Sequence, residues 1–164
     1  MPGVSARYLI DAATLGRATG MLENLALGTL VITACVLIHT FGLILLSRSM
    51  PWVVRWFQLH RHSLGQTLAV TATVLGLFFI HTLEIWLWAA VYVAVGAVGL
   101  FADALYFSTI TFSTVGYGDI TPRADWRLFA SFEAVNGFIL IGWSIAYLTA
   151  ASTRHGPFRI GEHF

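Results

Sequence analysis

Long runs without a charged residue limit the structures open to this chain. The first extends from Leu25 to Leu46, 22 residues interrupted only by the histidine His39. A bilayer core needs about 20 helical residues, so this run is long enough to cross a membrane. The chain is 57% hydrophobic and 10% charged, whereas a soluble domain is about 25% charged. The sequence therefore predicts an integral membrane protein.

Two further apolar stretches follow. Between residues 64 and 102 the only charged or histidine side chains are those of His81 and Glu84. One helix of that length would far exceed a bilayer core. We therefore expect one span followed by an apolar connection. The last stretch, from Trp126 to Ala151, carries Glu133 and is expected to form the third span.

The segment Pro51–His62 joins the first two spans. Pro51 suits the first turn of a new helix. At helical spacing, aromatic residues such as Trp52 and Trp56 fall on one side, and Arg55 and Arg61 fall on the other. Such a segment tends to lie in the membrane interface. A loop with aromatic anchors is the alternative.

A segment rich in glycine, TVGYGDITP (Thr114–Pro122), lies between the second and third apolar stretches. The preceding residues can form a helix, with Asp103 in its first turn, that is too short to cross the bilayer. Non-helical backbone at membrane depth must be buried in protein or line water. Because Gly116 and Gly118 reach positive φ without penalty, successive carbonyls can point to one side. Four such strands would stack rings of oxygen around a dehydrated cation.

This segment resembles the selectivity filter of potassium channels. The resemblance extends upstream through Ser108–Ser113 and downstream to Asp119, Pro122 and Trp126. It implies an all-α membrane protein with an outer helix, a re-entrant pore helix and filter, and an inner helix. One extra N-terminal transmembrane helix precedes this pore module, and the implied assembly is a homotetramer around a central pore.

The resemblance also implies roles for individual residues. The filter that binds potassium would consist of Thr114, Val115, Gly116, Tyr117 and Gly118. The carbonyl oxygens of the first four would be the ligands, with the Thr114 hydroxyl at the inner site. The ring of Tyr117 would hold the filter open by packing, and Asp119 would lie at the outer mouth.

The expected organisation places the filter on the extracellular side. The segments are 1–24, extracellular; 25–47, the extra helix; 48–63, a cytoplasmic interfacial helix or loop; 64–152, the pore domain; and 153–164, a cytoplasmic tail. Within the pore domain they are 64–88, outer helix; 89–101, connection; 102–113, pore helix; 114–119, filter; and 126–152, inner helix.

The expected function is passive, potassium-selective conduction across a bacterial plasma membrane by a multi-pass protein. No enzyme activity is expected, and no cofactor beyond potassium as the permeant ion. Nine basic and eight acidic residues leave no patch for nucleic acid. The alternatives are a non-selective cation channel, a subunit of a potassium transporter, a non-conducting regulatory subunit and a metal-dependent membrane enzyme.

Ionisable residues inside the spans are candidates for function because burying them is costly. His81 and Glu84 share a helix face. Two ligands are too few for a zinc site, so we expect a structural pair or a network behind the filter, which Glu133 could join. Tyr106 stands where many potassium channels carry a tryptophan that bonds the aspartate behind the filter. His39 is expected to be a core histidine with its hydrogen bonds satisfied.

Gating leaves fewer signals in the sequence. Gly137 and Gly142 are candidate hinges of the inner helix, with close helix packing as the alternative. Asn136 either faces the cavity or packs inside the chain. No ladder of arginines indicates a voltage sensor. Protonation on the cytoplasmic side is a further hypothesis for gating, and the histidines concerned are His60, His62, His155 and His163.

Overall fold

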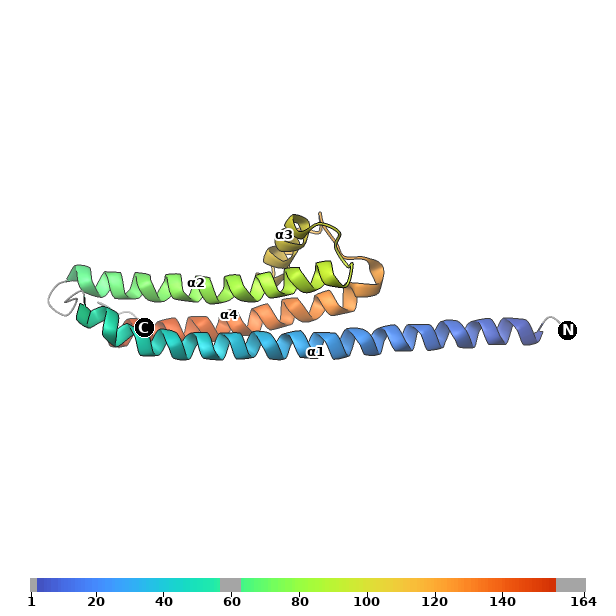
Figure 1. Ribbon diagram of the computed structural model, residues 1–164, viewed down its shortest axis with the longest axis horizontal. Coiled ribbons are helices and arrows are strands. Elements are labelled where there is room, and N and C mark those ends of the chain that lie inside the picture. The colour runs from blue at the N-terminus through green and yellow to red at the C-terminus, as the bar shows by residue number, and fades with distance from the viewer. Residues whose placement is uncertain (1–2, 57–62, 156–164) are drawn as a thin grey trace.

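A computed structural model of the chain describes residues 3–56 and 63–155, with side chains for 20–49 and 65–153. Its elements are α1 (Gly3–Trp56), α2 (Ser63–Ala94), α3 (Phe101–Phe112), the short 3-10 helix η2 (Ala124–Trp126) and α4 (Arg127–His155). Helices α1, α2 and α4 lie side by side, with α2 running opposite to the other two (Figure 1). The short α3 stands out from this bundle and packs against α2 and α4.

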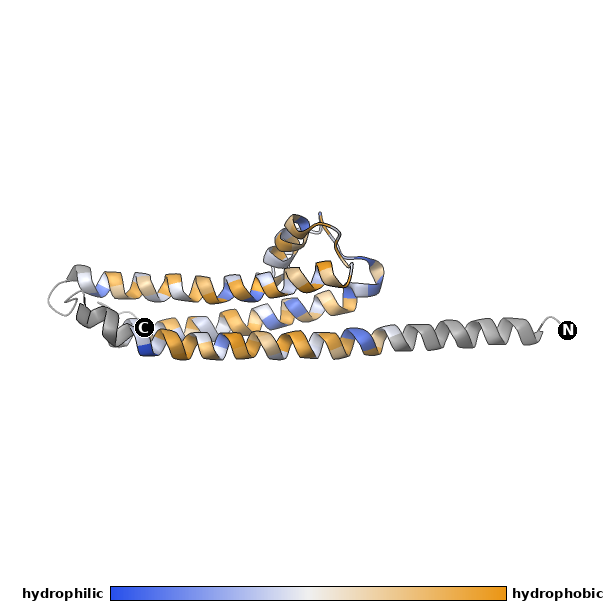
Figure 2. Cartoon of the chain, viewed as in Figure 1, coloured by the Kyte–Doolittle hydropathy of each residue, from blue (hydrophilic) through white to orange (hydrophobic). Residues whose placement is uncertain are grey.

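Three helical segments are long and apolar enough to cross a membrane: Gly20–Ser49, Gly65–Ala94 and Ala124–Thr153. Apolar residues dominate these segments along their length (Figure 2). Several hydroxyl groups within them bond to their own helix, as Thr29 does by donating to the carbonyl of Leu25 one turn earlier at 2.8 Å. Such bonds let polar side chains lie in an apolar surrounding. The chain is a multi-pass membrane protein.

The first helix is longer than the sequence predicted. Pro51 does not end it, since α1 continues to Trp56, and the residues before the expected span are helical from Gly3 onward. Proline inside a membrane helix is tolerated where the freed backbone group finds another partner. Residues 57–62 lie outside the described part of the chain, so the interfacial helix stays a prediction there.

The boundaries of the second helix also differ from the expectation. Helix α2 continues to Ala94, past the expected end at residue 88, and the connection to α3 is correspondingly short. Trp88 and Tyr92 are fully buried, so the helix carries core side chains through its last turns. The carbonyl of Tyr92 accepts a hydrogen bond from the amide of Ala97 at 2.8 Å, which closes the end of the helix.

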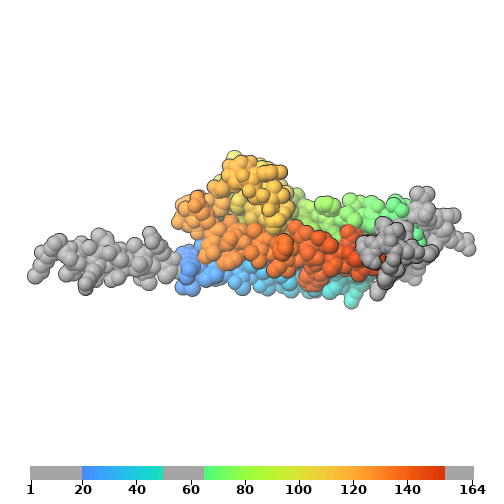
Figure 3. All heavy atoms as spheres, turned by 180° about the vertical axis from the view of Figure 1, so that it is seen from behind, coloured from blue at the N-terminus to red at the C-terminus, as the bar shows by residue number. Residues whose placement is uncertain are grey.

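The position of α3 is set by an aromatic cluster shared by three helices. Tyr92 of α2 meets Phe107 of α3 edge to face at 5.2 Å and Phe129 of α4 at 5.5 Å between ring centroids. Trp88 lies 4.9 Å from Phe129. Edge-to-face pairs of this kind are worth about 0.5–1.5 kcal/mol beyond the area they bury. Seen from behind, α3 and the segment after it rise from the surface above α4 (Figure 3).

Candidate functional site

The segment after α3 hangs from the carboxyl end of that helix. The amide of Thr114 donates to the carbonyl of Thr111 at 2.9 Å. The carbonyl of Ile110 accepts from the amides of both Val115 and Gly116, at 2.9 and 3.0 Å. These bonds satisfy carbonyls that a helix end otherwise leaves unpaired. They fix where the glycine-containing strand begins.

The sign of φ alternates along this strand. Thr114, Gly116 and Gly118 have φ of 62°, 56° and 77°, while Val115 and Tyr117 between them are not among the residues with positive φ. Thr114 is the one non-glycine residue with positive φ in the described part of the chain, and such a conformation costs about 1–2 kcal/mol for an L-residue. Alternation of this kind turns successive carbonyls to one side of the strand.

Tyr106 and Asp119 connect α3 to the far end of the strand. The Tyr106 hydroxyl donates a hydrogen bond to Asp119 Oδ2 at 2.8 Å. This bond holds the pKa of the Asp119 carboxyl below its ordinary value and raises the pKa of Tyr106. The bond therefore favours an anionic Asp119 at the end of the strand.

Glu133 of α4 is buried behind α3 and joins three helices. Tyr92 of α2 donates to its Oε2 at 2.6 Å. Ser108 of α3 lies 2.5 Å from its Oε1, and the same Ser108 hydroxyl is 2.9 Å from the carbonyl of Ile85. Glu133 thus fixes α3 against α2 and α4.

The hydrogen-bond contacts of Glu133 indicate the protonation state of its carboxyl group. Ser108 has a single hydroxyl proton for two neighbouring acceptors. If the carboxyl of Glu133 carries a proton, that proton goes to Ser108, the Ser108 proton goes to the carbonyl of Ile85, and Tyr92 donates to the second carboxyl oxygen. An ionised Glu133 would leave one contact of Ser108 without a proton. The geometry therefore favours a neutral carboxylic acid.

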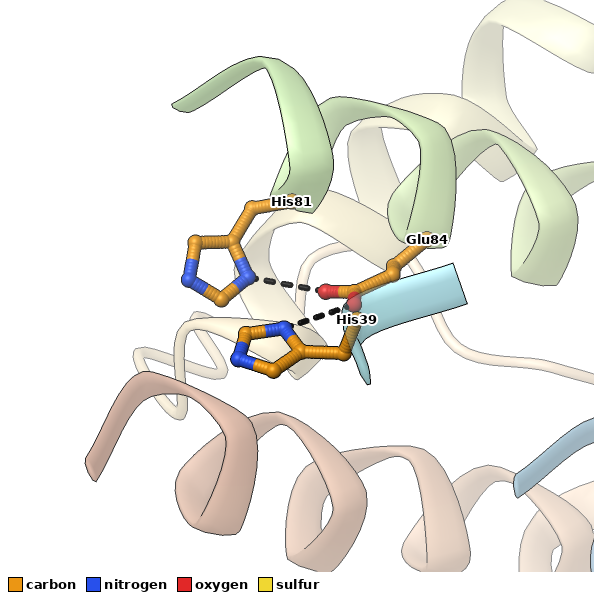
Figure 4. A group of neighbouring side chains, drawn as sticks. All are labelled: His39, His81 and Glu84. Atoms are coloured by element: carbon orange, nitrogen blue, oxygen red, sulfur yellow. Dashed lines mark hydrogen bonds and ion pairs between the residues drawn. The ribbon is translucent and has the colours of Figure 1, made fainter. Parts of the chain in front are cut away.

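A second buried cluster surrounds Glu84 of α2 (Figure 4). Its Oε1 lies 2.9 Å from Nδ1 of His39, which comes from α1, and its Oε2 lies 2.8 Å from Nδ1 of His81. His81 Nε2 lies 2.9 Å from the Ser144 hydroxyl on α4. The ring of His81 also meets that of Phe112, the last residue of α3, at 5.6 Å. The cluster therefore links all three long helices beside the end of α3.

Comparison with known proteins places this arrangement in a family. Residues 68–154 match the family described as Ion channel, and this region holds most of α2 and α4 and all of α3 and the strand. The chain belongs to the ion channel family. The resemblance indicated by the TVGYG segment is thereby confirmed.

Two relatives of this channel are potassium channels by name. The hyperpolarization-activated voltage-gated potassium channel of Methanocaldococcus jannaschii is 44% identical over 64 residues, 37% of this chain and 28% of that protein. The two-pore potassium channel 4 of Arabidopsis thaliana is 78% identical over 26 residues, 16% of this chain and 9% of that protein. The matches thus span less than a third of either relative. No solved structure matches the chain.

Helix α1 is hydrogen-bonded to α4, or to the residues just before it, near both ends of α4. Near the start of α4, Asn24 of α1 accepts from the amide of Phe129 at 2.9 Å and donates to the carbonyl of Asp125 at 3.0 Å. Near its other end, the hydroxyls of Ser47 and Tyr147 lie 3.0 Å apart. These pairs do not follow from the sequence, because no local pattern marks two polar residues that meet across 100 or more positions.

The sequence leaves two possible roles for each of three residues of α4: Asn136, Gly137 and Gly142. Asn136 is only 4% exposed within this chain, which agrees with the packing alternative, and its cavity-lining role stays a prediction. Gly137 lies against the backbone of Phe112, which is the close packing given as the alternative to a hinge. Gly142 has open space beside it, and α4 is continuous through both glycines.

Among the residues missed by sequence reasoning, Tyr92 and Ser108 bind Glu133, and Ser144 binds His81. Tyrosine and serine in membrane helices are too common to be singled out by type alone. His39 was expected to be a satisfied core histidine. It is buried and bound through Nδ1, but its Nε2 has no hydrogen-bond partner in the described part of the chain.

Proposed function

We propose that this channel conducts potassium selectively and passively through the strand Thr114–Gly118. The observation that carries the proposal is the alternating sign of φ along this strand, which begins at the end of a helix too short to span a membrane. Backbone of this form offers a column of carbonyl oxygens that can replace the hydration shell of K⁺. The potassium channels among the relatives support the same reading.

In the proposed filter, K⁺ is bound by the carbonyl oxygens of Thr114, Val115, Gly116 and Tyr117 and by the Thr114 hydroxyl. One chain supplies one strand, whereas a dehydrated ion needs oxygens on all sides. Within a single chain the Val115 and Tyr117 side chains are 53% and 73% exposed. Neighbouring chains would cover them in a homotetramer. The ring of Tyr117 would then brace the filter from outside.

The contacts around α3 suit a support for such a filter. Tyr106 ties the outer end of the strand to α3 through Asp119, and Glu133 ties the middle of α3 to α2 and α4. Carbonyl oxygens that repel one another stay in place only if the surrounding structure holds the strand. We assign these side chains the role of positioning the filter and not of binding the ion.

The proposed orientation follows from a filter that opens to the outside of the cell. Helix α2 then runs outward, and α1 and α4 run inward. The N-terminus would be extracellular and the tail beyond α4 cytoplasmic. The proposed location is the plasma membrane of a bacterium.

The experiment is a measurement of reversal potential on purified protein reconstituted into planar bilayers. With potassium on one side and sodium on the other, we expect the current to reverse near the potassium equilibrium potential. Gly116→Asp should abolish the current because a side chain would enter the strand at a positive φ. Gly99→Ala is the matched control, since Gly99 has open space around it and no positive φ.

Other outcomes of this recording separate the alternatives. A robust current that reverses near zero would mean a non-selective cation channel. A folded protein that stays silent in every condition would favour a non-conducting subunit. Native mass spectrometry of the purified assembly tests the homotetramer directly, and any number of chains other than four would contradict the proposed ring of oxygens.

A further inference from the structure

The residues His39, His81 and Glu84 together offer three groups that can bind a metal ion. One ligand atom from each lies within 4.8 Å of the others. Glu84 and His39 are fully buried, and His81 is 16% exposed. The sequence brings together only His81 and Glu84, because His39 comes from a different helix. We propose that this triad is a binding site for a divalent transition-metal ion of the zinc class.

The chemistry of the three groups selects this class of ion. Zn²⁺ binds imidazole nitrogen and carboxylate oxygen, and two histidines with one glutamate are one of its recurring ligand sets. Calcium and magnesium prefer sites made of oxygen alone, as does the permeant K⁺. The triad is therefore distinct in kind from the filter. It would hold a resident ion and not pass one.

The geometry of the triad is close to what such an ion needs. Nδ1 of His39 and Nδ1 of His81 both face the carboxylate of Glu84, at 2.9 and 2.8 Å, as Figure 4 shows. Bonds of about 2.0–2.2 Å to a tetrahedral ion place the ligand atoms roughly 3.4 Å apart. Each histidine nitrogen would need to move away from the carboxylate oxygen that it faces by about half an ångström. The ion would replace the protons that now lie in these contacts.

One histidine of the triad is held by a hydrogen bond outside the triad, and the other is not. His81 is held through Nε2 by the Ser144 hydroxyl at 2.9 Å, the type of contact that orients metal-binding histidines. Nε2 of His39 is buried and has no partner among the described residues. His39 can offer either ring nitrogen.

The triad borders a groove through His81. His81 and Ser144 line a groove between α2, α3 and α4 with a volume of about 610 Å³. Water would fill the fourth position of the ion, while Ser144 stays bonded to Nε2 of His81. The bound ion would join α1 to α2 beside the ring of Phe112, and an ion that binds only the folded protein raises its melting temperature.

The test is a count of bound zinc in the full-length protein. The protein would carry an affinity tag that contains no histidine. Glutamine would replace the four histidines outside the triad, so that no other histidine binds zinc: His60, His62, His155 and His163. After dialysis against Zn²⁺ in potassium buffer, we expect one zinc per chain by elemental analysis. His39→Gln and Glu84→Gln should each lower retention by about tenfold or more. Thr40→Ala, next to His39 but outside the triad, should retain zinc.

A second measurement leaves the triad unchanged, so its result does not depend on the folding of a triad variant. Cobalt(II) added to the same histidine-reduced protein should give the visible absorption bands of a four-coordinate ion, and zinc should displace it. The proposal is overturned if this protein retains neither metal, or if zinc retention is the same after replacement of His39 and of Glu84. Neither readout depends on current, so this test is independent of the proposed conduction.

Discussion

Gly137 of α4 lies directly against the carbonyl group of Phe112, the last residue of α3. A Cβ at position 137 would overlap the carbonyl oxygen and lie 2.8 Å from the carbonyl carbon. Backbone cannot move aside as a flexible side chain can. This contact lets the inner helix approach the base of the proposed filter, and it explains glycine here by close packing.

Gly137→Ala is therefore expected to destabilise the protein by about 1–3 kcal/mol or more, because the added methyl group overpacks the contact. The measurement is the thermal unfolding of the purified protein. Gly142→Ala is the matched control: the space beside Gly142 is open, and alanine favours a helix over glycine by about 0.5–1 kcal/mol. Unchanged stability of Gly137→Ala together with reduced channel opening would favour a hinge instead.

Tyr106→Phe should change how Asp119 responds to acid. The hydrogen bond from Tyr106 lowers the pKa of Asp119. The stability that this bond contributes is therefore fully present above the ordinary pKa of the carboxyl, and it is lost as pH falls through the lowered value. Without the donor, the pKa should rise toward its ordinary value. Acid should then alter the current at a higher external pH than in the unchanged protein.

The measurement is the current as a function of external pH. Asp119→Asn serves as the control, because it removes the titrating group and should abolish this part of the acid response. An identical midpoint in Tyr106→Phe and the unchanged protein would show that the bond does not act on Asp119 in the working channel.

Glu133→Gln should be tolerated, whereas Glu133→Ala should not. Glutamine can donate to Ser108 and accept from Tyr92, as the neutral acid does, so we expect a change within about 1 kcal/mol. Alanine leaves the buried Tyr92 hydroxyl without its acceptor, at a cost of about 1–3 kcal/mol, while Ser108 keeps the carbonyl of Ile85. Thermal unfolding measures both. A glutamine variant as unstable as the alanine variant would indicate that Glu133 is ionised.

Asn24→Ala should weaken the attachment of α1 to α4. Trp126, directly before α4, has no side-chain oxygen that could accept from the first amides of that helix. Asn24 of α1 provides such an oxygen, its Oδ1, for the amide of Phe129. Loss of such a cap costs about 0.5–2 kcal/mol. Thr29→Ala is the control. The Thr29 side chain lies on the same helix and bonds to the carbonyl of Leu25 within that helix, so its loss should change thermal stability little. Equal melting temperatures for both variants would contradict the role of Asn24.

Local patterns in the sequence were sufficient for the parts of the fold that depend on neighbouring residues. The number of membrane spans follows from apolar runs, and the place of the strand Thr114–Gly118 follows from a short helix before a glycine-containing segment. Even so, local rules misjudged where α1 and α2 end. Pro51 does not stop a helix in this setting, and the fully buried Tyr92 carries α2 beyond its expected end.

The partners of the polar residues were decided only by the tertiary structure. His81 and Glu84 share a face because they lie one helical turn apart, which the sequence alone determines. That His39 completes this cluster, and that Asn24 meets Phe129 across 105 positions, depends on which faces of the long helices meet. The physical reason is that lipid is as apolar as the helices themselves, so hydrophobic patterning does not select the contacting faces. Close packing and buried hydrogen bonds select them, and these form only when the helices assemble.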